Sequence, residues 1–428
     1  MSIYTPEISP PVREKERRRL PIVRIVLACL LLLALYRGAG DDPSSPPPPE
    51  EEIRTEEINR EGEPLQEGEE GDNPTAEEVA PPPPREMTPS FREIFLSRQP
   101  DPALGDSLLD VLTSQNPYGA VYLMVDGENG RILAWGEQNN FEPLSAPSGL
   151  SKSNFPAASL AKIVTAATAL ESNRYSNHTE IPAIGSSVTL YRNQLAVPKN
   201  YRGRMVTLES AFASSMNPSM GIVGQSLGEE RLLQTAERFG FNRAFSAGIP
   251  EMSLFSTNGD RFGIAEAASG FTNGITLSPL LAAAMVRAVL TGAIPEIPWS
   301  PLIGADATPA VPVKLGGEPF SENTYYGLRR MFEATIQKGS ARSPFRNKRV
   351  FYPYNRERLR VGGKTGTKDD GNLRYEWFAG YALDRKNTNK SVVLVCLHMN
   401  ELKGTRASVP AQAAALLLNH WARKYLEW

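Results

Sequence analysis

The clearest structural pattern in this sequence is VGGKTGTKDDGNLRYEWFAGYALDRKNTNKSVVLVCLH, residues 361–398. Three runs rich in apolar and β-branched residues stand close together in it, over Val361–Thr367, Glu376–Leu383 and Ser391–His398. Segments rich in Asn, Asp, Lys and Gly separate these runs, which is typical of strands joined by short turns. We therefore predict three consecutive strands of an antiparallel sheet near the C-terminus.

Two more strands are expected at the start of the globular part of the chain. Ala120–Val125 is an apolar run, Asp126–Gly130 has the residues of a turn, and Arg131–Trp135 reads as the returning strand of a hairpin. The segment between the two β regions has mostly helical spacing of its apolar residues. The helices expected there are Ala158–Leu170, Leu208–Leu227, Glu229–Phe239, Pro279–Leu290 and Asn323–Gln337.

Helical spacing also precedes the first strand, over Asp101–Leu112, and follows the last strand, over Pro410–Leu426. Strands at both ends of a sequence with helices between them favour one sheet that both ends complete. The predicted fold class is therefore α+β: an antiparallel five-stranded sheet flanked by terminal helices, with an inserted all-helical lobe.

Charge divides the 428 residues into three parts, although the net charge of −2 looks ordinary. The balance is +4 over residues 1–40 and −13 over 41–90, which leaves +7 for residues 91–428. Only the last part combines apolar periodicity with mixed charge. We expect one folded domain over 91–428.

The basic N-terminal part contains a candidate membrane segment. Leu20–Tyr36 is apolar apart from one proline and one arginine, and it follows three consecutive arginines. A run of this length is at the short end of what crosses a hydrocarbon core of about 30 Å. The pattern predicts a cytoplasmic tail over 1–19 and a single transmembrane anchor over 20–37, with the rest of the chain in the extracytoplasmic space. The alternative is a cleaved signal peptide that ends near Gly38-Ala39-Gly40.

Residues 38–90 read as a disordered linker. Two runs of four prolines, Pro46–Pro49 and Pro81–Pro84, enclose Glu-rich sequence with few large apolar residues. Such a segment buries too little surface to offset the entropy of ordering it. We expect a solvated, self-repelling tether.

Neither a metal nor a cofactor is expected. The chain has two cysteines, one of them inside the apolar N-terminal run, and its three histidines, His178, His398 and His420, are isolated. This pattern excludes a disulfide framework and offers no zinc spacing. The charge pattern gives no reason to expect a nucleic-acid partner.

One serine and lysine have the spacing of a nucleophile and its base. In ASLAK, residues 158–162, Ser159 precedes Lys162 by three residues, and this spacing occurs once in the chain. On a helix, both side chains lie on the same side. A lysine can take the proton of a hydroxyl only when burial or a nearby cation lowers its pKa. Taken alone, the pair also fits an ordinary helix with a solvated lysine.

A second hydroxyl and a carboxamide would complete such a site. Ser-x-Asn occurs four times, and we select Ser215 with Asn217 because they open or interrupt a predicted helix just before Pro218. The hydroxyl would relay a proton to the leaving group, and the carboxamide would bind an amide of the substrate. Ser256 is the reserve candidate.

The tetrapeptide Lys364-Thr365-Gly366-Thr367 occurs once, on a predicted strand. Its glycine permits close approach of another backbone, and its two hydroxyls can bind a carboxylate. Its lysine, if near Lys162, would help to keep one of the two amines neutral. The balance of +7 over 91–428 agrees with an acidic substrate.

The ordered set Ser-x-x-Lys, Ser-x-Asn and Lys-Thr-Gly resembles that of penicillin-binding proteins and β-lactamases. The interval from Asn217 to Lys364 is similar to the long interval of high-molecular-weight penicillin-binding proteins. Over residues 95–428, the chain resembles the transpeptidase domain of a monofunctional class B member. Further stretches that carry this resemblance are Asp126–Trp135, Phe239-Gly240-Phe241, Lys338–Ala341 and Trp377–Tyr381.

The resemblance implies a penicillin-sensitive D,D-transpeptidase that cross-links peptidoglycan stem peptides ending in D-Ala-D-Ala. It assigns the nucleophile to Ser159, the base to Lys162, the proton relay to Ser215 and the contact with the peptide amide to Asn217. β-Lactams would acylate the same serine as inhibitors. Cell-wall synthesis proteins are candidate partners.

The resemblance also assigns substrate binding to the Lys-Thr-Gly strand. Lys364, Thr365 and Thr367 would hold the terminal carboxylate of the substrate, with Gly366 between them. The backbone N–H groups of Ser159 and Thr367 would form the oxyanion hole.

The sequence departs from the family pattern at several points. Ala157-Ala158 stands where Pro-Gly is usual before the serine, and Gly270–Gly274 stands where a Gly-Gln-Gly triplet is common. The acidic tether takes the place of a folded pedestal domain. The residues also fit a D,D-carboxypeptidase or a β-lactamase, in which water resolves the acyl-enzyme. The fold alone would fit a non-catalytic β-lactam sensor or scaffold.

Overall fold

The computed structural model describes residues 88–146, 148–243, 251–299, 311–403 and 409–426. The expected cytoplasmic tail, the anchor or signal segment and nearly all of the linker lie outside these residues. Within the described part of the chain, no helix combines the length and the apolar character that a membrane crossing requires.

The helices are α2 (Pro89–Ser97), α3 (Pro102–Gln115), the 3-10 turn η1 (Ala158–Ala161), α4 (Lys162–Glu171), α5 (Arg192–Leu195), α6 (Leu208–Ala213), α7 (Asn217–Leu227), α8 (Glu229–Phe239), α9 (Arg261–Ser269), α10 (Pro279–Thr291), α11 (Glu322–Gln337), α12 (Arg342–Arg346), α13 (Pro353–Arg358) and α14 (Pro410–Tyr425). The strands are β1 (Gly119–Asp126), β2 (Ile132–Asn139), β3 (Glu142–Leu144), β4 (Phe155–Pro156), β5 (Glu180–Pro182), β6 (Met205–Thr207), β7 (Thr276–Leu277), β8 (Glu296–Trp299), β9 (Val311–Lys314), β10 (Leu359–Asp370), β11 (Leu373–Asp384) and β12 (Ser391–Glu401).

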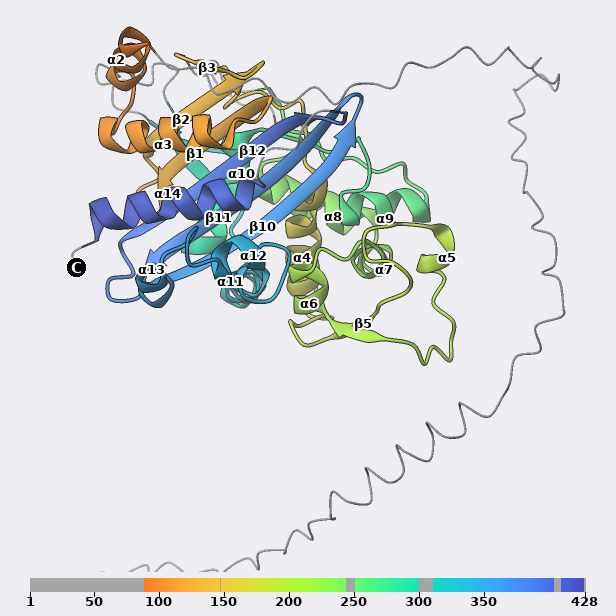
Figure 1. The fold of residues 1–428 in the computed structure, drawn as a ribbon. Helices are drawn as coiled ribbons and strands as arrows, with labels where there is room; N and C mark the ends of the chain where they lie inside the picture. Colours follow the sequence, from red (N-terminus) through yellow and green to blue (C-terminus); the bar gives the residue numbers. More distant parts are fainter. Residues whose placement is uncertain (1–87, 147, 244–250, 300–310, 404–408, 427–428) are drawn as a thin grey trace, which may run out of the picture. The chain divides into compact units, whose positions relative to one another are not determined.

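The central sheet is antiparallel, with strand order β10-β11-β12-β1-β2-β3 (Figure 1). β1 pairs with β12 along its whole length, from Gly119 opposite Met399 to Asp126 opposite Val392. The two ends of the domain therefore complete one sheet, which confirms the predicted α+β class. The predicted number of five strands is wrong by one: β3 has only three residues, too few to show a period of two.

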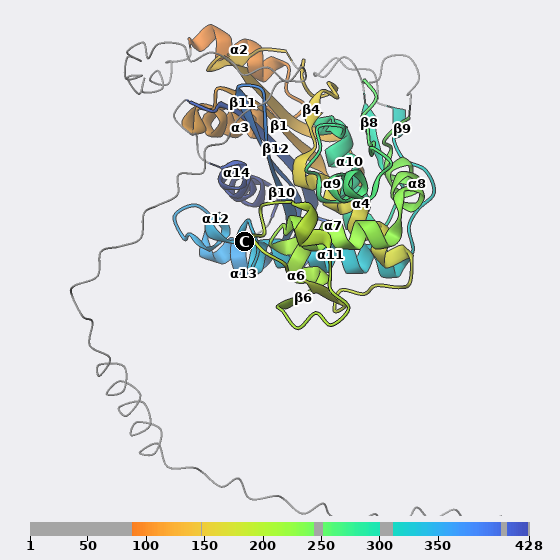
Figure 2. The ribbon, with the colours of Figure 1, turned by 90° about the vertical axis from the view of Figure 1, so that its right-hand side faces the viewer.

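The two faces of the sheet carry separate cores. Along β1, Tyr122 and Met124 pack with residues of α3 and α14, whereas Leu123 and Val125 pack with residues of α10, α11 and the lobe. This alternation follows from the period of two along a strand. Figure 2 shows the resulting layers, with α3 and α14 on one side of the sheet and α10 with the lobe on the other.

The inserted lobe is mostly helical, and the prediction that it is all helical is wrong. Three two-stranded pairs, β4 with β7, β5 with β6 and β8 with β9, stand among its helices. Strands of two to four residues leave no recognisable alternation in a sequence. The helix expected over Leu208–Leu227 is interrupted between α6 and α7, where Ser215 has a φ of 56°.

Candidate active site

The turn η1 brings the predicted serine and lysine together. Ser159 lies within this turn, and Lys162 is the first residue of α4. In a 3-10 turn, side chains three residues apart eclipse each other, and the Lys162 Nζ lies 2.7 Å from the Ser159 Oγ. Ala158, just before the serine, has a φ of 48°. The chain thus makes here, with an alanine, a left-handed turn that a glycine would make with less strain.

Both the sheet and the lobe hold this turn. The Trp377 Nε1 on β11 donates a hydrogen bond of 2.9 Å to the Pro156 carbonyl, and the Ala157 N–H donates to the Ile275 carbonyl at 3.0 Å. A Cβ at Gly366 would lie 3.3 Å from the Ala158 Cβ and 3.4 Å from the Ser159 nitrogen. β10 therefore runs directly beside the serine.

The Lys162 amine is fully buried and has three partners. Besides the Ser159 Oγ, it contacts the Asn217 Oδ1 at 2.7 Å and the Ser269 carbonyl. The Asn217 amide is oriented by its Nδ2, which donates to the Val188 carbonyl at 2.8 Å. A neutral amine has two N–H groups for these two oxygen acceptors and one lone pair left for the Ser159 hydroxyl. The geometry therefore suits a neutral Lys162 that takes the proton of Ser159.

The Ser269 carbonyl is available because it lies at the C-terminal end of α9, where helix carbonyls have no partner within the helix. Gly270 ends the helix with a φ of 67°. The Thr165 Oγ1 of α4 donates to the neighbouring Ala268 carbonyl at 2.7 Å, and Lys162 donates to that of Ser269. Side chains of α4 thus provide donors for the free carbonyls at the end of α9, and one of these carbonyls orients Lys162.

Two causes lower the pKa of Lys162 well below 10.5. The larger is burial, which disfavours the charged amine, and the second is the positive charge of Lys364. Burial lowers the pKa of Lys364 as well, from 10.5 to about 7. The positive charge of Lys364 thus favours the neutral form of Lys162, and the cost of two buried cations side by side is avoided.

Ser215 stands opposite Lys364. The Lys364 Nζ donates to the Ser215 Oγ at 2.9 Å and to the Thr365 carbonyl at the same distance. The ring of Phe212 lies under the amine, with its centroid 5.4 Å from the nitrogen. Ser215 reaches this position because its left-handed backbone ends one helix before Asn217 starts the next.

Hydrogen bonds join Lys162 to Ser159 and Asn217, and a separate hydrogen bond joins Lys364 to Ser215. Ser159, Ser215 and Asn217 line one cleft, and the charge of Lys364 acts on Lys162, so the five residues form one group. The reserve candidate Ser256 lies outside this group, and its hydroxyl donates to the Gly274 carbonyl at 2.7 Å. Thr365 and Thr367 line the same cleft as Ser159.

This cleft has a volume of about 730 Å³. Its lining includes residues that the sequence did not single out for the site, among them Val188, Phe271, Ser340, Lys368 and Arg374. Ser340 touches the predicted strand directly, because its hydroxyl is hydrogen-bonded to the Thr365 Oγ1. In the sequence, only the stretch Lys338–Ala341 pointed to Ser340. This stretch carries the family resemblance but has no catalytic pattern of its own.

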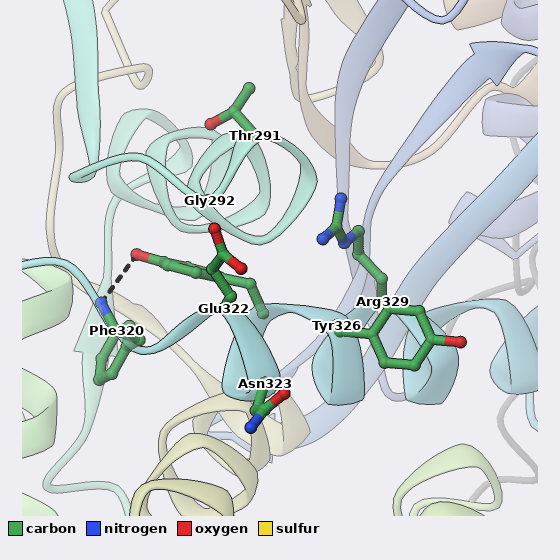
Figure 3. A pocket seen from close by; sticks show the side chains of 8 residues that line it. Thr291, Gly292, Phe320, Glu322, Asn323, Tyr326 and Arg329 are labelled. Carbon is green, nitrogen blue, oxygen red and sulfur yellow. Dashed lines mark hydrogen bonds between the residues drawn. The ribbon is translucent and has the colours of Figure 1, made fainter. Parts of the chain in front are cut away.

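A second cleft of about 480 Å³ lies at the N-terminal end of α11 and contains none of the predicted site residues. Figure 3 shows Glu322 and Arg329 rising from the same side of α11 toward the end of α10, near Thr291. Among the described residues, no group of three or more His, Cys, Asp or Glu side chains is placed to hold a metal ion.

Comparison with known proteins gives a consistent result. Residues 120–418 match the family model described as the penicillin binding protein transpeptidase domain. The stage V sporulation protein D of Bacillus subtilis (strain 168) is 25% identical over 279 residues, which are 59% of this chain and 40% of that protein. The chain therefore matches less than half of the length of that relative.

Solved structures show the same fold. The D,D-transpeptidase domain of a peptidoglycan glycosyltransferase from Eggerthella lenta superposes with a TM-score of 0.56 at 20% identity, covering 76% of this chain and 81% of that one. The imipenem acyl-enzyme complex of penicillin-binding protein A from M. tuberculosis gives 0.55 at 16% identity, with coverages of 74% and 77%. The transpeptidase domain of penicillin-binding protein 3 from Burkholderia pseudomallei gives 0.56 at 17%, with coverages of 79% and 95%.

Proposed function

Because this chain belongs to the family of penicillin-binding protein transpeptidase domains, we propose that it is a penicillin-sensitive D,D-transpeptidase that cross-links peptidoglycan stem peptides through an acyl-enzyme on Ser159. The observation that carries the proposal is the buried Lys162 amine, which lies 2.7 Å from the Ser159 Oγ and has its other contacts with two oxygen acceptors. A hydroxyl needs such a base to become a nucleophile.

The acylation step follows from this contact. The Ser159 Oγ attacks the carbonyl carbon of the penultimate D-alanine, and its proton passes to the Lys162 Nζ. The tetrahedral intermediate carries a negative oxygen, for which the N–H groups of Ser159 and Thr367 are the candidate donors. When the intermediate collapses, the C–N bond breaks, and the departing amine of D-alanine needs a proton. Ser215 supplies it, because its hydroxyl is hydrogen-bonded to Lys364 and can be reprotonated through that amine.

The second step reverses the proton movements. The amine of an acceptor stem peptide attacks the ester carbonyl, its proton is taken up by the same relay, and a new amide bond forms. The Ser159 Oγ leaves and recovers a proton from Lys162. A β-lactam follows only the first step, because its ring opens without releasing a leaving group from the site.

The hydroxyls of Thr365 and Thr367, with the cation of Lys364, are the proposed contacts for the terminal carboxylate of the donor. A bound carboxylate would raise the pKa of Lys364 from its value of about 7 and keep that amine charged. Asn217 would bind the peptide amide beside its contact with Lys162. We place this reaction in the extracytoplasmic space, with the chain anchored by residues 20–37 and joined to other cell-wall synthesis proteins.

Labelling with a fluorescent penicillin tests the proposal. The full-length wild type in detergent should be labelled stoichiometrically, and Ser159→Ala should show no label. Ser172→Ala is the matched control, because Ser172 lies at the far end of α4. An unlabelled wild type, or equal labelling of Ser159→Ala, would refute the acyl-enzyme. Cross-linking of a lipid-linked stem-peptide substrate then separates a transpeptidase from a carboxypeptidase or β-lactamase, which would hydrolyse the acyl-enzyme, and from a sensor, which would retain it.

A further inference from the structure

Lys368 lies on β10 four residues after Lys364, at a position for which the sequence predicted no role. The period of two along a strand puts both lysines and Gly366 on one face. All three contact the lobe: Lys364 reaches Ser215, Gly366 abuts the turn of Ser159, and the Lys368 Nζ donates to the Phe271 carbonyl at 2.6 Å.

The hydrogen bond of Lys368 is one of several contacts between the end of β10 and the segment Gly270–Gly274. The same amine lies 5.1 Å from the centroid of the Phe271 ring. Further along, the Asn273 Nδ2 donates to the Asp370 Oδ1 at 3.4 Å. The end of β10 thus holds the segment Gly270–Gly274, which directly follows α9. This is the segment that departs from the usual family triplet.

The held segment begins next to a residue of the catalytic group. Phe271 is two residues after Ser269, whose carbonyl accepts a hydrogen bond from Lys162. Phe271 is tied to the end of α9, because its N–H donates to the Glu266 carbonyl at 2.8 Å and the Gly270 N–H donates to the Ala267 carbonyl at 3.1 Å. A displacement of Phe271 would therefore move the Ser269 carbonyl.

We propose that Lys368 is a positioning residue for the catalytic base. It holds Phe271 so that the Ser269 carbonyl keeps one N–H of Lys162 engaged and leaves the lone pair directed at Ser159. The other acceptor of Lys162 is Asn217. It lies two residues after Ser215, which accepts a hydrogen bond from Lys364. Lys368 thus holds the segment that carries the Ser269 carbonyl, and Lys364 holds the segment that carries Asn217. Both segments orient Lys162. The inference rests on the proposed function, because it assigns a role in acylation.

The test compares variants of the full-length protein in rapid-quench labelling with a fluorescent penicillin. These data separate the dissociation constant of the non-covalent complex from the rate constant of acylation. Lys368→Met keeps the aliphatic stem and loses the donor, Lys368→Arg keeps the donor and the charge, and Lys348→Met is the matched control at an exposed lysine outside the cleft. Hydrogen exchange of the segment 270–274 is measured in the same proteins without any ligand.

We expect Lys368→Met to lower the acylation rate constant about tenfold, the equivalent of one net hydrogen bond, with the dissociation constant within about twofold of the wild type. The acylation rate constant of Lys368→Arg should stay within about threefold of the wild-type value. Hydrogen exchange of the segment 270–274 should increase in Lys368→Met alone. Wild-type acylation by Lys368→Met, an equal loss in Lys368→Arg, or unchanged exchange would each overturn the positioning role. An unlabelled wild type would instead refute the proposed function.

Discussion

The amide of Asn217 is the contact through which the protonation of Lys162 can be changed most directly. In Asn217→Asp, a carboxylate oxygen replaces the Oδ1 that lies 2.7 Å from the Lys162 Nζ. The negative charge stabilises the charged amine and raises its pKa. At an effective dielectric constant of about 20, two unit charges at this distance attract by about 6 kcal/mol, or about 4 pKa units. Because Asn217 lines a cleft that is open to solvent, which screens the attraction, we expect about half of this, a rise of about 2 pKa units.

The pH dependence of acylation by a fluorescent penicillin measures this shift. In the wild type, we expect the rate constant to rise with pH as Lys162 loses its proton. This rise should lie well below pH 10.5, because burial and the charge of Lys364 lower the pKa of Lys162. In Asn217→Asp, the rise should move upward by about 2 pH units. Below it, acylation should be slower by about 100-fold, and it should recover at alkaline pH.

Asn217→Ala is the matched control. It removes the same hydrogen bond and the proposed contact with the substrate amide, but it adds no charge. Its rate constant should fall at every pH, and the rise should not move upward. The second oxygen of an aspartate would face the Val188 carbonyl, so the melting temperature of both variants is measured as well. If Asn217→Asp and Asn217→Ala rise at the same pH, Lys162 is not the base or does not contact this amide.

Two further predictions concern stability. Gly270→Ala should lower the free energy of unfolding by about 3 kcal/mol or more and slow acylation, because φ is 67° and the new Cβ would meet the Ala158 carbonyl oxygen. Gly371→Ala is the control: φ is 58° there, but the space around the new Cβ is open, so the loss should be only about 1 kcal/mol. Urea unfolding measures both values. Lys364 has a pKa of about 7 when folded and 10.5 as its ordinary value, so the unfolded chain binds more protons between these pH values and stability rises with pH, by about 5 kcal/mol from this group. Unfolding of Lys364→Met should lack this rise, and a parallel pH dependence of the two proteins would contradict the depressed pKa.

The strands of the sheet were predictable because their burial imposes a pattern. β1 and β12 are apolar over nearly their whole length, since each lies inside the sheet with a core on both faces. β3 and the short pairs of the lobe were missed, because two to four residues carry no periodicity. The interruption at Ser215 is visible in the sequence only through Pro218. The left-handed backbone that makes it, with a φ of 56°, follows from the packing of the lobe.

The side chains of the proposed site could be predicted from the sequence, but the backbone groups could not. The residue types and spacings of Ser159, Lys162, Ser215, Asn217 and Lys364 predict one chemistry, which stays a prediction. The structure places these side chains near one another, around one cleft. The Ser269 and Phe271 carbonyls could not be found in this way, because any residue supplies a backbone carbonyl. What selects these two is the place where α9 ends, at Gly270, and the position of Lys368 on the neighbouring strand.

Strained backbone occurs at two positions of the proposed site, and the sequence does not reveal it at either. Apart from glycines and four asparagines, which tolerate a positive φ, the described residues with this conformation are Phe141, Ala158 and Ser215. Two of these three stand in the site: Ala158 precedes the proposed nucleophile, and Ser215 is the proposed relay. Neither residue favours its conformation, so each persists because its surroundings hold it: η1 through Trp377 and Gly366, and Ser215 through Lys364. A fully buried pair of lysines adds a further cost at the same point. The large core that joins the sheet to the lobe therefore has a role beyond folding, because it keeps a locally unfavourable arrangement of serine and amine in place before any substrate arrives.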